Sequence, residues 1–133
     1  MDDVKRTPGG ERIDKPWGHE IIWARTDRYV GKILFIRKGH MLSLQYHELK
    51  DETIFLQSGV MRFTVGEKDA GAPGVRTLRA GERYHIRPGV IHRMEALEDC
   101  HVFEVSTPEL DDVVRLEDVY GRAPEGNDGA PSP

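Results

Sequence analysis

Short strand-like runs dominate the chain, and glycine and proline turn signals separate them instead of helical segments. Apolar residues in these runs alternate with polar ones, or follow one another, over lengths typical of a β-strand. Many short strands without long helices between them predict an all-β domain built from two sheets, as a sandwich or a barrel. The predicted strands span residues 20–24, 29–36, 41–47, 53–57, 60–65, 75–78, 83–86, 91–96 and 101–106.

The length of 133 residues suits one domain with a real core and is too short for two. Residues 1–12 and 123–133 are rich in polar residues, glycine or proline and offer almost nothing to bury. We therefore expect a flexible N-terminus over 1–12, a single domain over 13–122 and a disordered tail over 123–133. Within the domain, residues 108–120 have near-helical spacing of apolar side chains, which predicts a turn of helix.

Charge and cysteine content exclude several classes of protein. The formal net charge is -4 and no basic stripe occurs, so nucleic acid is not an expected partner. The single cysteine, Cys100, excludes an internal disulfide and fits a reducing compartment; its acidic neighbours disfavour a thiolate. No apolar run approaches the ~18 residues that span a membrane, and the first residues do not resemble a signal peptide. We expect a cytoplasmic protein without a membrane partner.

Two histidines, a carboxylate and an amide can converge on one face of the predicted sheet. Gln45 and His47 are two residues apart, so on a strand their side chains share a face. Taken alone, that polar face favours a solvent-exposed strand, but Glu52 and His92, which can reach it from neighbouring strands, reverse the preference. The set suits a divalent transition metal (Zn, Mn, Fe, Co or Ni) with coordination positions left open.

Charged residues also occur in strands of otherwise interior character, notably Lys32 and Glu104. A buried charge without a partner costs several kcal/mol, so each is either solvent-facing or part of a polar cavity. Inside a barrel, Lys32 would need Glu104 or an anionic ligand as its partner. Arg93 would point away from His92 on a regular strand, but a turn at Pro88-Gly89 can bring it to the site.

The other four histidines are weaker candidates for the site. We expect His19 and His40 in surface or loop positions. His85 and His101 lie in predicted strands, where a cavity-facing position and an ordinary packing role are equally compatible with the sequence.

These residues resemble the motifs of the cupin family, whose fold is a jelly-roll barrel, a double-stranded β-helix. The first cupin motif is matched in spacing throughout, with Gln45 in place of its first histidine. The second motif is matched at Gly81, Gly89 and His92, whereas its proline is shifted to Pro88 and its final asparagine is replaced by Ala96. The residues that match the first motif are Gly39, Gln45, His47, Glu52 and Gly59.

Within the cupins, the chain resembles the C-terminal domain of type II phosphomannose isomerases, over about residues 14–122. The resemblance implies Gln45, His47, Glu52 and His92 as metal ligands, and Lys32 and Arg93 match Lys and Arg positions of that family. Two departures are Glu48-Leu49-Lys50 in place of a run of histidines, and Gly31 before Lys32. The segments that carry the resemblance are Lys15-Pro16-Trp17-Gly18, Leu42 to His47, Ile91-His92-Arg93 and Val119-Tyr120-Gly121-Arg122.

The resemblance implies a metal-dependent aldose–ketose isomerase of the mannose-6-phosphate type, with a sugar phosphate as substrate. Lys32 and Arg93 would hold the phosphate or polarise an oxygen, and Glu104 or Glu48 would move the proton. Two alternatives stay open. One is another cupin reaction, a cyclase, epimerase or oxygenase acting on a small molecule, and the other is a non-catalytic metal- or sugar-binding module.

An apolar cluster near the N-terminus predicts self-association. Trp17, Ile21, Ile22 and Trp23 precede the predicted barrel, and a lone domain of this size does not obviously cover them. We expect a homodimer in which the N-terminal strand packs on, or adds to, a sheet of the partner and protects its edge.

Overall fold

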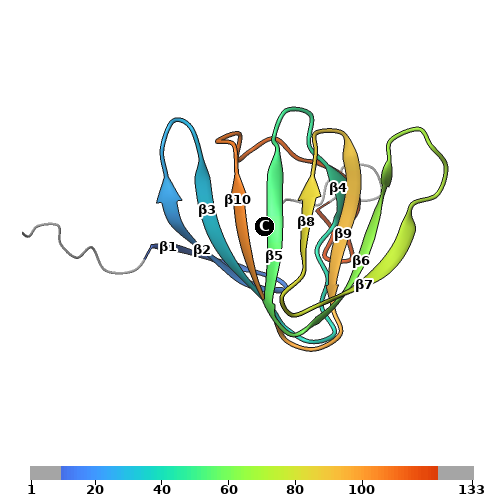
Figure 1. Cartoon of the computed structure of the whole chain (residues 1–133), viewed down its shortest axis with the longest axis horizontal. Helices are drawn as coiled ribbons and strands as arrows, with labels where there is room; N and C mark the ends of the chain where they lie inside the picture. The colour runs from blue at the N-terminus through green and yellow to red at the C-terminus, as the bar shows by residue number, and fades with distance from the viewer. Residues whose placement is uncertain (1–9, 123–133) are drawn as a thin grey trace, which may run out of the picture.

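The computed structural model describes residues 10–122, and within that range it has eleven β-strands and no helix (Figure 1). One antiparallel sheet has six strands in the order β1-β2-β3-β10-β5-β8, and the other has five in the order β11-β4-β9-β6-β7. The bounds are β1 Glu11–Lys15, β2 Gly18–Arg25, β3 Val30–Ile36, β4 Leu44–Tyr46, β5 Glu52–Ser58, β6 Val60–Glu67, β7 Gly74–Arg79, β8 Arg83–Ile86, β9 Val90–Ala96, β10 Cys100–Ser106 and β11 Val114–Glu117. The all-β, two-sheet prediction is therefore confirmed.

Each predicted strand overlaps an observed one, but two further strands were not predicted. β1 is mostly exposed and charged, and its register is set only by pairing with β2, from Glu11 opposite Ile22 to Lys15 opposite Gly18. The helical turn expected over residues 108–120 is wrong, because β11 pairs there with β4. The apolar spacing of that segment has another origin, since Leu110 and Val113 face the cavity described below.

The described residues overlap the predicted flexible N-terminus at the first strand. Glu11 and Arg12, which we expected in a flexible N-terminus, belong to β1. Residues 1–9 and 123–133, which include the rest of that segment and the predicted tail, lie outside the described residues. Within the described residues, no helix is long and apolar enough to cross a membrane.

The core lies between the two sheets, and the inward faces of β3 and β10 change from apolar to charged along their length. On β3, Leu34 and Ile36 are buried beside the apolar core, while Lys32 is buried two residues before them. The same change occurs on β10, from Val102 to Glu104. Strand alternation puts these residues on one face. One end of the space between the sheets is therefore apolar, and the other is lined by buried polar side chains.

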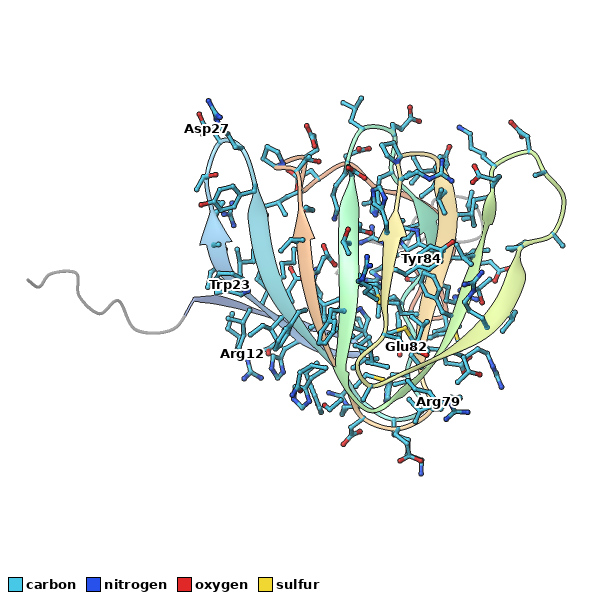
Figure 2. All side chains as sticks on the ribbon, viewed as in Figure 1. Arg12, Trp23, Asp27, Arg79, Glu82 and Tyr84 are labelled. Atoms are coloured by element: carbon cyan, nitrogen blue, oxygen red, sulfur yellow. The ribbon has the colours of Figure 1, made fainter. Side chains whose placement is uncertain are left out.

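Tight turns connect strands of one sheet to strands of the other. Gly59, between β5 and β6, has φ +101°, and a Cβ there would lie 2.2 Å from the carbonyl oxygen of Asp99. This glycine is required both by its backbone conformation and by the close approach. The β7–β8 connection carries the chain from one sheet to the other, and there the backbone N–H of Arg79 donates to Glu82, both labelled in Figure 2.

Candidate metal centre and cavity

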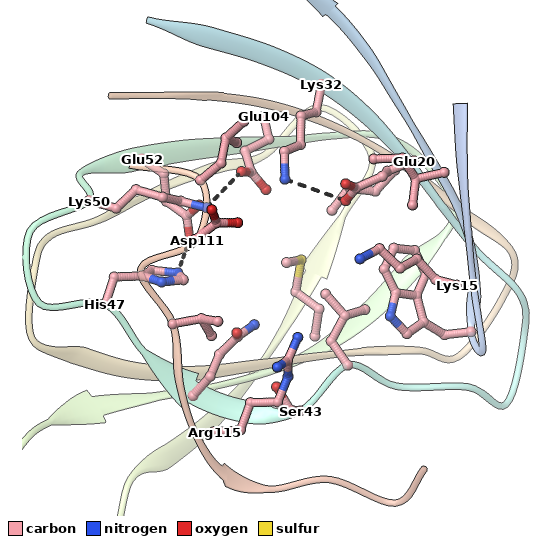
Figure 3. Close-up of a pocket in the computed structure, with 18 of the residues that line it drawn as sticks. Lys15, Glu20, Lys32, Ser43, His47, Lys50, Glu52, Glu104, Asp111 and Arg115 are labelled. Atoms are coloured by element: carbon pink, nitrogen blue, oxygen red, sulfur yellow. Dashed lines mark hydrogen bonds and ion pairs between the residues drawn. The ribbon is translucent and has the colours of Figure 1, made fainter. Parts of the chain in front are cut away.

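A cavity of about 300 Å³ lies at the polar end of the space between the sheets (Figure 3). Its walls come from β3, β5 and β10 on one side and from β4 and β9 on the other. β1, β2 and the segment 110–122 also line it, and the half-buried or exposed lining residues of β1 and of 110–115 form its mouth. This volume is at the small end of the range for ligand pockets. The cavity therefore suits a small molecule.

His47, Glu52 and His92 converge in the wall of this cavity. Each offers a ligand atom within 4.8 Å of the others, and all three side chains are buried. The Glu52 carboxylate oxygen Oε2 lies 3.2 Å from His47 Nε2 and 3.3 Å from His92 Nε2. Gln45 pairs with His92 in the β4–β9 register and also lines the cavity, although it is only partly buried. The structure therefore brings together the side chains that were predicted to meet.

The outer ring nitrogens of both histidines are fixed by backbone carbonyl groups. His47 Nδ1 lies 2.6 Å from the carbonyl oxygen of Asp112, and His92 Nδ1 lies 3.0 Å from that of Val90. A carbonyl oxygen only accepts hydrogen bonds, so each Nδ1 carries the proton and donates it. In the neutral rings, Nε2 then presents a lone pair toward Glu52, and a proton or a cation is needed between these acceptors.

Buried atoms without partners support the fit of a metal to this group. Glu52 Oε1 and His92 Nε2 have no hydrogen-bond partner among the described residues, although Lys50 Nζ lies 3.2 Å from Glu52 Oε1. Imidazole nitrogen and carboxylate oxygen are donors that divalent transition metals take in proteins. The residues present could thus hold a metal ion.

Burial alone would raise the pKa of Glu52. The nearby rings of His47 and His92 and the positive charge of Lys50 outweigh this effect, so the pKa of Glu52 lies well below its ordinary value. Glu52 is therefore ionised at neutral pH, which is the form that binds a metal.

Lys50 joins the Glu52 carboxylate to a second buried carboxylate, Glu104. Lys50 Nζ lies 3.5 Å from Glu104 Oε2, and all three side chains are at most 7% exposed (Figure 3). Burial lowers the pKa of Lys50, but the charges of Glu104 and Glu52 raise it above its ordinary value. Burial and the nearby Glu52 raise the pKa of Glu104 to about 7. The cavity therefore holds a fixed positive charge beside a carboxylate that exchanges its proton near neutral pH.

Lys32 lies inside the barrel and lines the cavity, but its partner is not the one expected. Lys32 Nζ lies 3.4 Å from Glu20 Oε1, and both side chains are buried. Glu104 is opposite Lys32 in the β3–β10 register, yet its ion-pair partner is Lys50. Sequence reasoning missed Glu20 because its partner lies on the adjacent strand β3, at a position that only the register defines.

The structure does not bring Arg93 or Glu48 into the cavity. Arg93 follows His92 on the regular strand β9 and points to the opposite face, where it donates to the carbonyl oxygen of Leu42 and to Glu117. The turn at Pro88-Gly89 does not redirect it. Glu48 is exposed on the β4–β5 connection.

The remaining histidines lie away from the cavity. His85 and His101 are exposed; His85 pairs with Asp51, and His101 packs against Phe35. His40 is half-buried and stacks on Tyr120. His19 lies on the other side of Phe35. The packing interpretation therefore holds for His101, and neither His85 nor His101 faces the cavity.

Three cationic side chains that the sequence analysis did not select surround the cavity mouth: Lys15, Arg115 and Arg122. Burial and the nearby charges of Lys32, Arg122 and Arg115 lower the pKa of Lys15, against the opposing effect of the Glu20 carboxylate. Burial and the charge of Arg122 lower the pKa of Arg115, whose Nε has no hydrogen-bond partner among the described residues. Asp118 neutralises Arg122, at 2.9 Å. The cavity mouth thus concentrates positive charge, which a bound anion would neutralise. Lys15 and Arg122 lie in two of the segments that carry the resemblance.

Comparison with known proteins identifies relatives of the chain. The family model described as mannose-6-phosphate isomerase C-terminal matches residues 3–118. The xanthan biosynthesis protein XanB of Xanthomonas campestris is 32% identical over 116 residues, which cover 84% of this chain and 24% of that protein. The mannose-1-phosphate guanylyltransferase ManC of Salmonella typhimurium is 32% identical over 115 residues, covering 83% and 23%. The chain thus spans about a quarter of the length of these relatives.

Solved structures share the fold at lower sequence identity. KdgF from Halomonas sp. superposes with a TM-score of 0.65 at 20% identity, covering 84% of this chain and 94% of that one. The capsular polysaccharide assembling protein CapF from Staphylococcus aureus gives a TM-score of 0.71 at 17% identity, covering 88% and 37%. Together with the two-sheet topology, these matches confirm the cupin fold.

Proposed function

Because the chain belongs to the mannose-6-phosphate isomerase C-terminal family, we propose that it is a metal-dependent aldose–ketose isomerase acting on a sugar phosphate of the mannose-6-phosphate type. One observation carries the proposal. The buried group of His47, Glu52 and His92 opens into a cavity that also holds Glu104. In this proposal Gln45 is the fourth ligand of a divalent transition metal.

The reaction moves one proton between neighbouring carbons, so it needs a group that takes and returns a proton near neutral pH. Glu104 has that property, because its pKa is raised to about 7 and its carboxylate faces the cavity. Lys50, held charged 3.5 Å away, would stabilise negative charge that develops on a substrate oxygen. A metal bound at the histidines would add electrostatic stabilisation of the same charge.

The phosphate of the substrate would lie at the cavity mouth. A phosphate dianion loses its hydration on binding, so cationic donors have to replace the water. Burial and neighbouring positive charges lower the pKa values of Lys15 and Arg115, and the nearby carboxylates of Glu20 and Asp118 offset this effect only in part. In this proposal they take the role expected of Arg93, while Lys32, paired with Glu20, borders the site.

The departures from the isomerase pattern fall mostly outside the cavity. Glu48 and Leu49, which replace two histidines of the family's run, are exposed, and only Lys50 faces inward. This placement favours the isomerase over the alternatives of another cupin reaction or a non-catalytic binding module.

The test is metal analysis combined with an isomerase assay on mannose 6-phosphate. The wild-type protein should retain a divalent metal and convert the sugar, whereas His92→Ala should lose both while keeping its circular dichroism spectrum. His101→Ala, on the outer face of the sheet, is the matched control and should behave like the wild type. A wild type that binds none of Zn, Mn, Fe, Co or Ni would contradict the proposal. A metal-loaded wild type without turnover would leave the binding module as the better interpretation.

A further inference from the structure

The β4–β5 connection joins two of the proposed metal ligands, and the C-terminal segment is hydrogen-bonded to this connection. The loop is the connection from His47 to Glu52, between β4 and β5. We call residues 107–117 the strap, because they run beside this loop and end in β11. The backbone N–H groups of all four intervening residues donate to strap side chains: Glu48, Leu49 and Lys50 to the Asp112 carboxylate and Asp51 to Thr107 Oγ1.

Asp112 makes the larger share of these contacts. Its carboxylate accepts the three N–H groups at 3.0, 2.6 and 2.8 Å, an arrangement in which successive amides surround one anion. These bonds lower the pKa of Asp112 against the opposing effect of burial. The carboxylate thus fixes the backbone of the loop directly between the two ligand residues.

The same residue contacts the first ligand through its backbone. The Asp112 carbonyl oxygen accepts from His47 Nδ1 at 2.6 Å, which directs Nε2 toward Glu52. A hydrogen bond from the ring nitrogen that does not bind the metal orients a ligating histidine and fixes its tautomer. Asp112 thereby sets both the position of the loop and the orientation of the His47 ring.

The strap also forms part of the cavity wall. Leu110, Asp111, Val113 and Arg115 line the cavity, on either side of Asp112. A displacement of the strap would therefore move the ligand loop and the mouth of the cavity together.

We propose that Asp112 is a positioning residue for the metal centre, which holds His47 and Glu52 in binding geometry through the loop and the imidazole. This inference rests on the proposed metal-binding function, and it assigns to the C-terminal strap a role that the ligand motif does not contain. Without the carboxylate, the loop loses three backbone hydrogen bonds that water must replace. The strap then loses its main attachment to the loop, so its Asp112 carbonyl group no longer holds the His47 ring in one fixed orientation.

The experiment measures Zn²⁺ affinity of the full chain by competition with a chelator. Asp112→Ala should bind Zn²⁺ about 10- to 100-fold more weakly than the wild type, in line with other residues that orient metal ligands. Asp112→Asn, which keeps the shape and one acceptor, should lie between the two. Asp99→Ala is the matched control, because the exposed Asp99 carboxylate also accepts a backbone N–H, that of Lys38, but lies outside the cavity and the ligand loop, and it should leave the affinity unchanged.

A second measurement separates this inference from the proposed function. In the metal-free protein, ¹⁵N spectra should show His47 protonated at Nδ1 in the wild type, with a lower Nδ1-protonated population in Asp112→Ala. Asp112→Asn replaces that variant if the alanine protein does not fold. Zn²⁺ affinities within twofold of each other, or an unchanged His47 spectrum, would overturn the inference. Failure of the wild type to bind any metal would contradict the proposed function and with it a role in metal binding, whereas the spectrum would still decide whether Asp112 orients the His47 ring.

Discussion

Replacing Glu104 by glutamine should change how the stability of the metal-free protein depends on pH. Burial and the Glu52 carboxylate raise the pKa of Glu104 from its ordinary 4.5 to about 7. Between these values the folded protein keeps a proton that the unfolded chain has already released. The free energy of unfolding therefore falls as the pH rises through this window.

The size of the effect follows from the raised pKa. Each unit corresponds to about 1.36 kcal/mol, so the shift from 4.5 to about 7 represents about 3 kcal/mol lost by pH ~8. Glutamine cannot ionise and resembles the protonated carboxyl. We expect Glu104→Gln to match the wild type near pH 4.5 and to be more stable by about 3 kcal/mol near pH 8. The attraction of Lys50 is already contained in this pKa.

Urea unfolding followed by tryptophan fluorescence, in the presence of a chelator, measures both proteins across this pH range. Glu98→Gln removes an exposed carboxylate on the β9–β10 turn and serves as the control, whose profile should parallel that of the wild type. If the profile of Glu104→Gln is also parallel to that of the wild type, the pKa of Glu104 is not raised in the folded protein. The proposed role of Glu104 in proton transfer would then fail as well.

Two further predictions concern the outer surface and the thiol. Of the apolar cluster that predicted self-association, Trp17 and Ile22 are buried within the chain, which corrects that part of the expectation, but Trp23 is 58% exposed on the six-stranded sheet. The outer face of this sheet also carries the exposed Phe55 and Phe103. Light scattering should therefore detect a homodimer that Trp23→Asp weakens, and a monomeric wild type at micromolar concentration would contradict this prediction. Cys100 is buried and its pKa is raised to about 11, chiefly by burial, so a thiol reagent should label it only after unfolding; rapid labelling of the native protein would be incompatible with this placement.

The sequence predicts most strands here because their side chains alternate with period two, and burial of one face preserves that pattern. It also indicated that Gln45 and His47 share a face, which follows from the pattern alone. β1 and β11 could not be found in this way, since their strand conformation depends on pairing with β2 and β4. β1 gives no alternating signal, and the four alternating residues of β11 are too few to outweigh the near-helical spacing of the longer segment around them.

The same limit applies to the prediction of the site residues. The spacing within one strand indicates which side chains share a face, but not which residue of another strand meets them. Lys32 was expected beside Glu104 and instead pairs with Glu20, because β3 lies between β2 and β10 and offers two neighbours. Asp112 was missed for a related reason: it reaches its loop from 62 to 64 residues away in the chain.

The strand order of the larger sheet has a consequence for how the chain is made. β10 lies between β3 and β5, so neither earlier strand can complete its pairing on that side until residues 100–106 have left the ribosome. β9, which supplies His92, also emerges late, and β4 must wait for both β9 and β11. Such long-range pairing is slow and leaves unpaired strand edges exposed during synthesis. The domain therefore completes its fold only after nearly all of residues 10–117 have been translated, and the proposed metal ligands first meet at that stage.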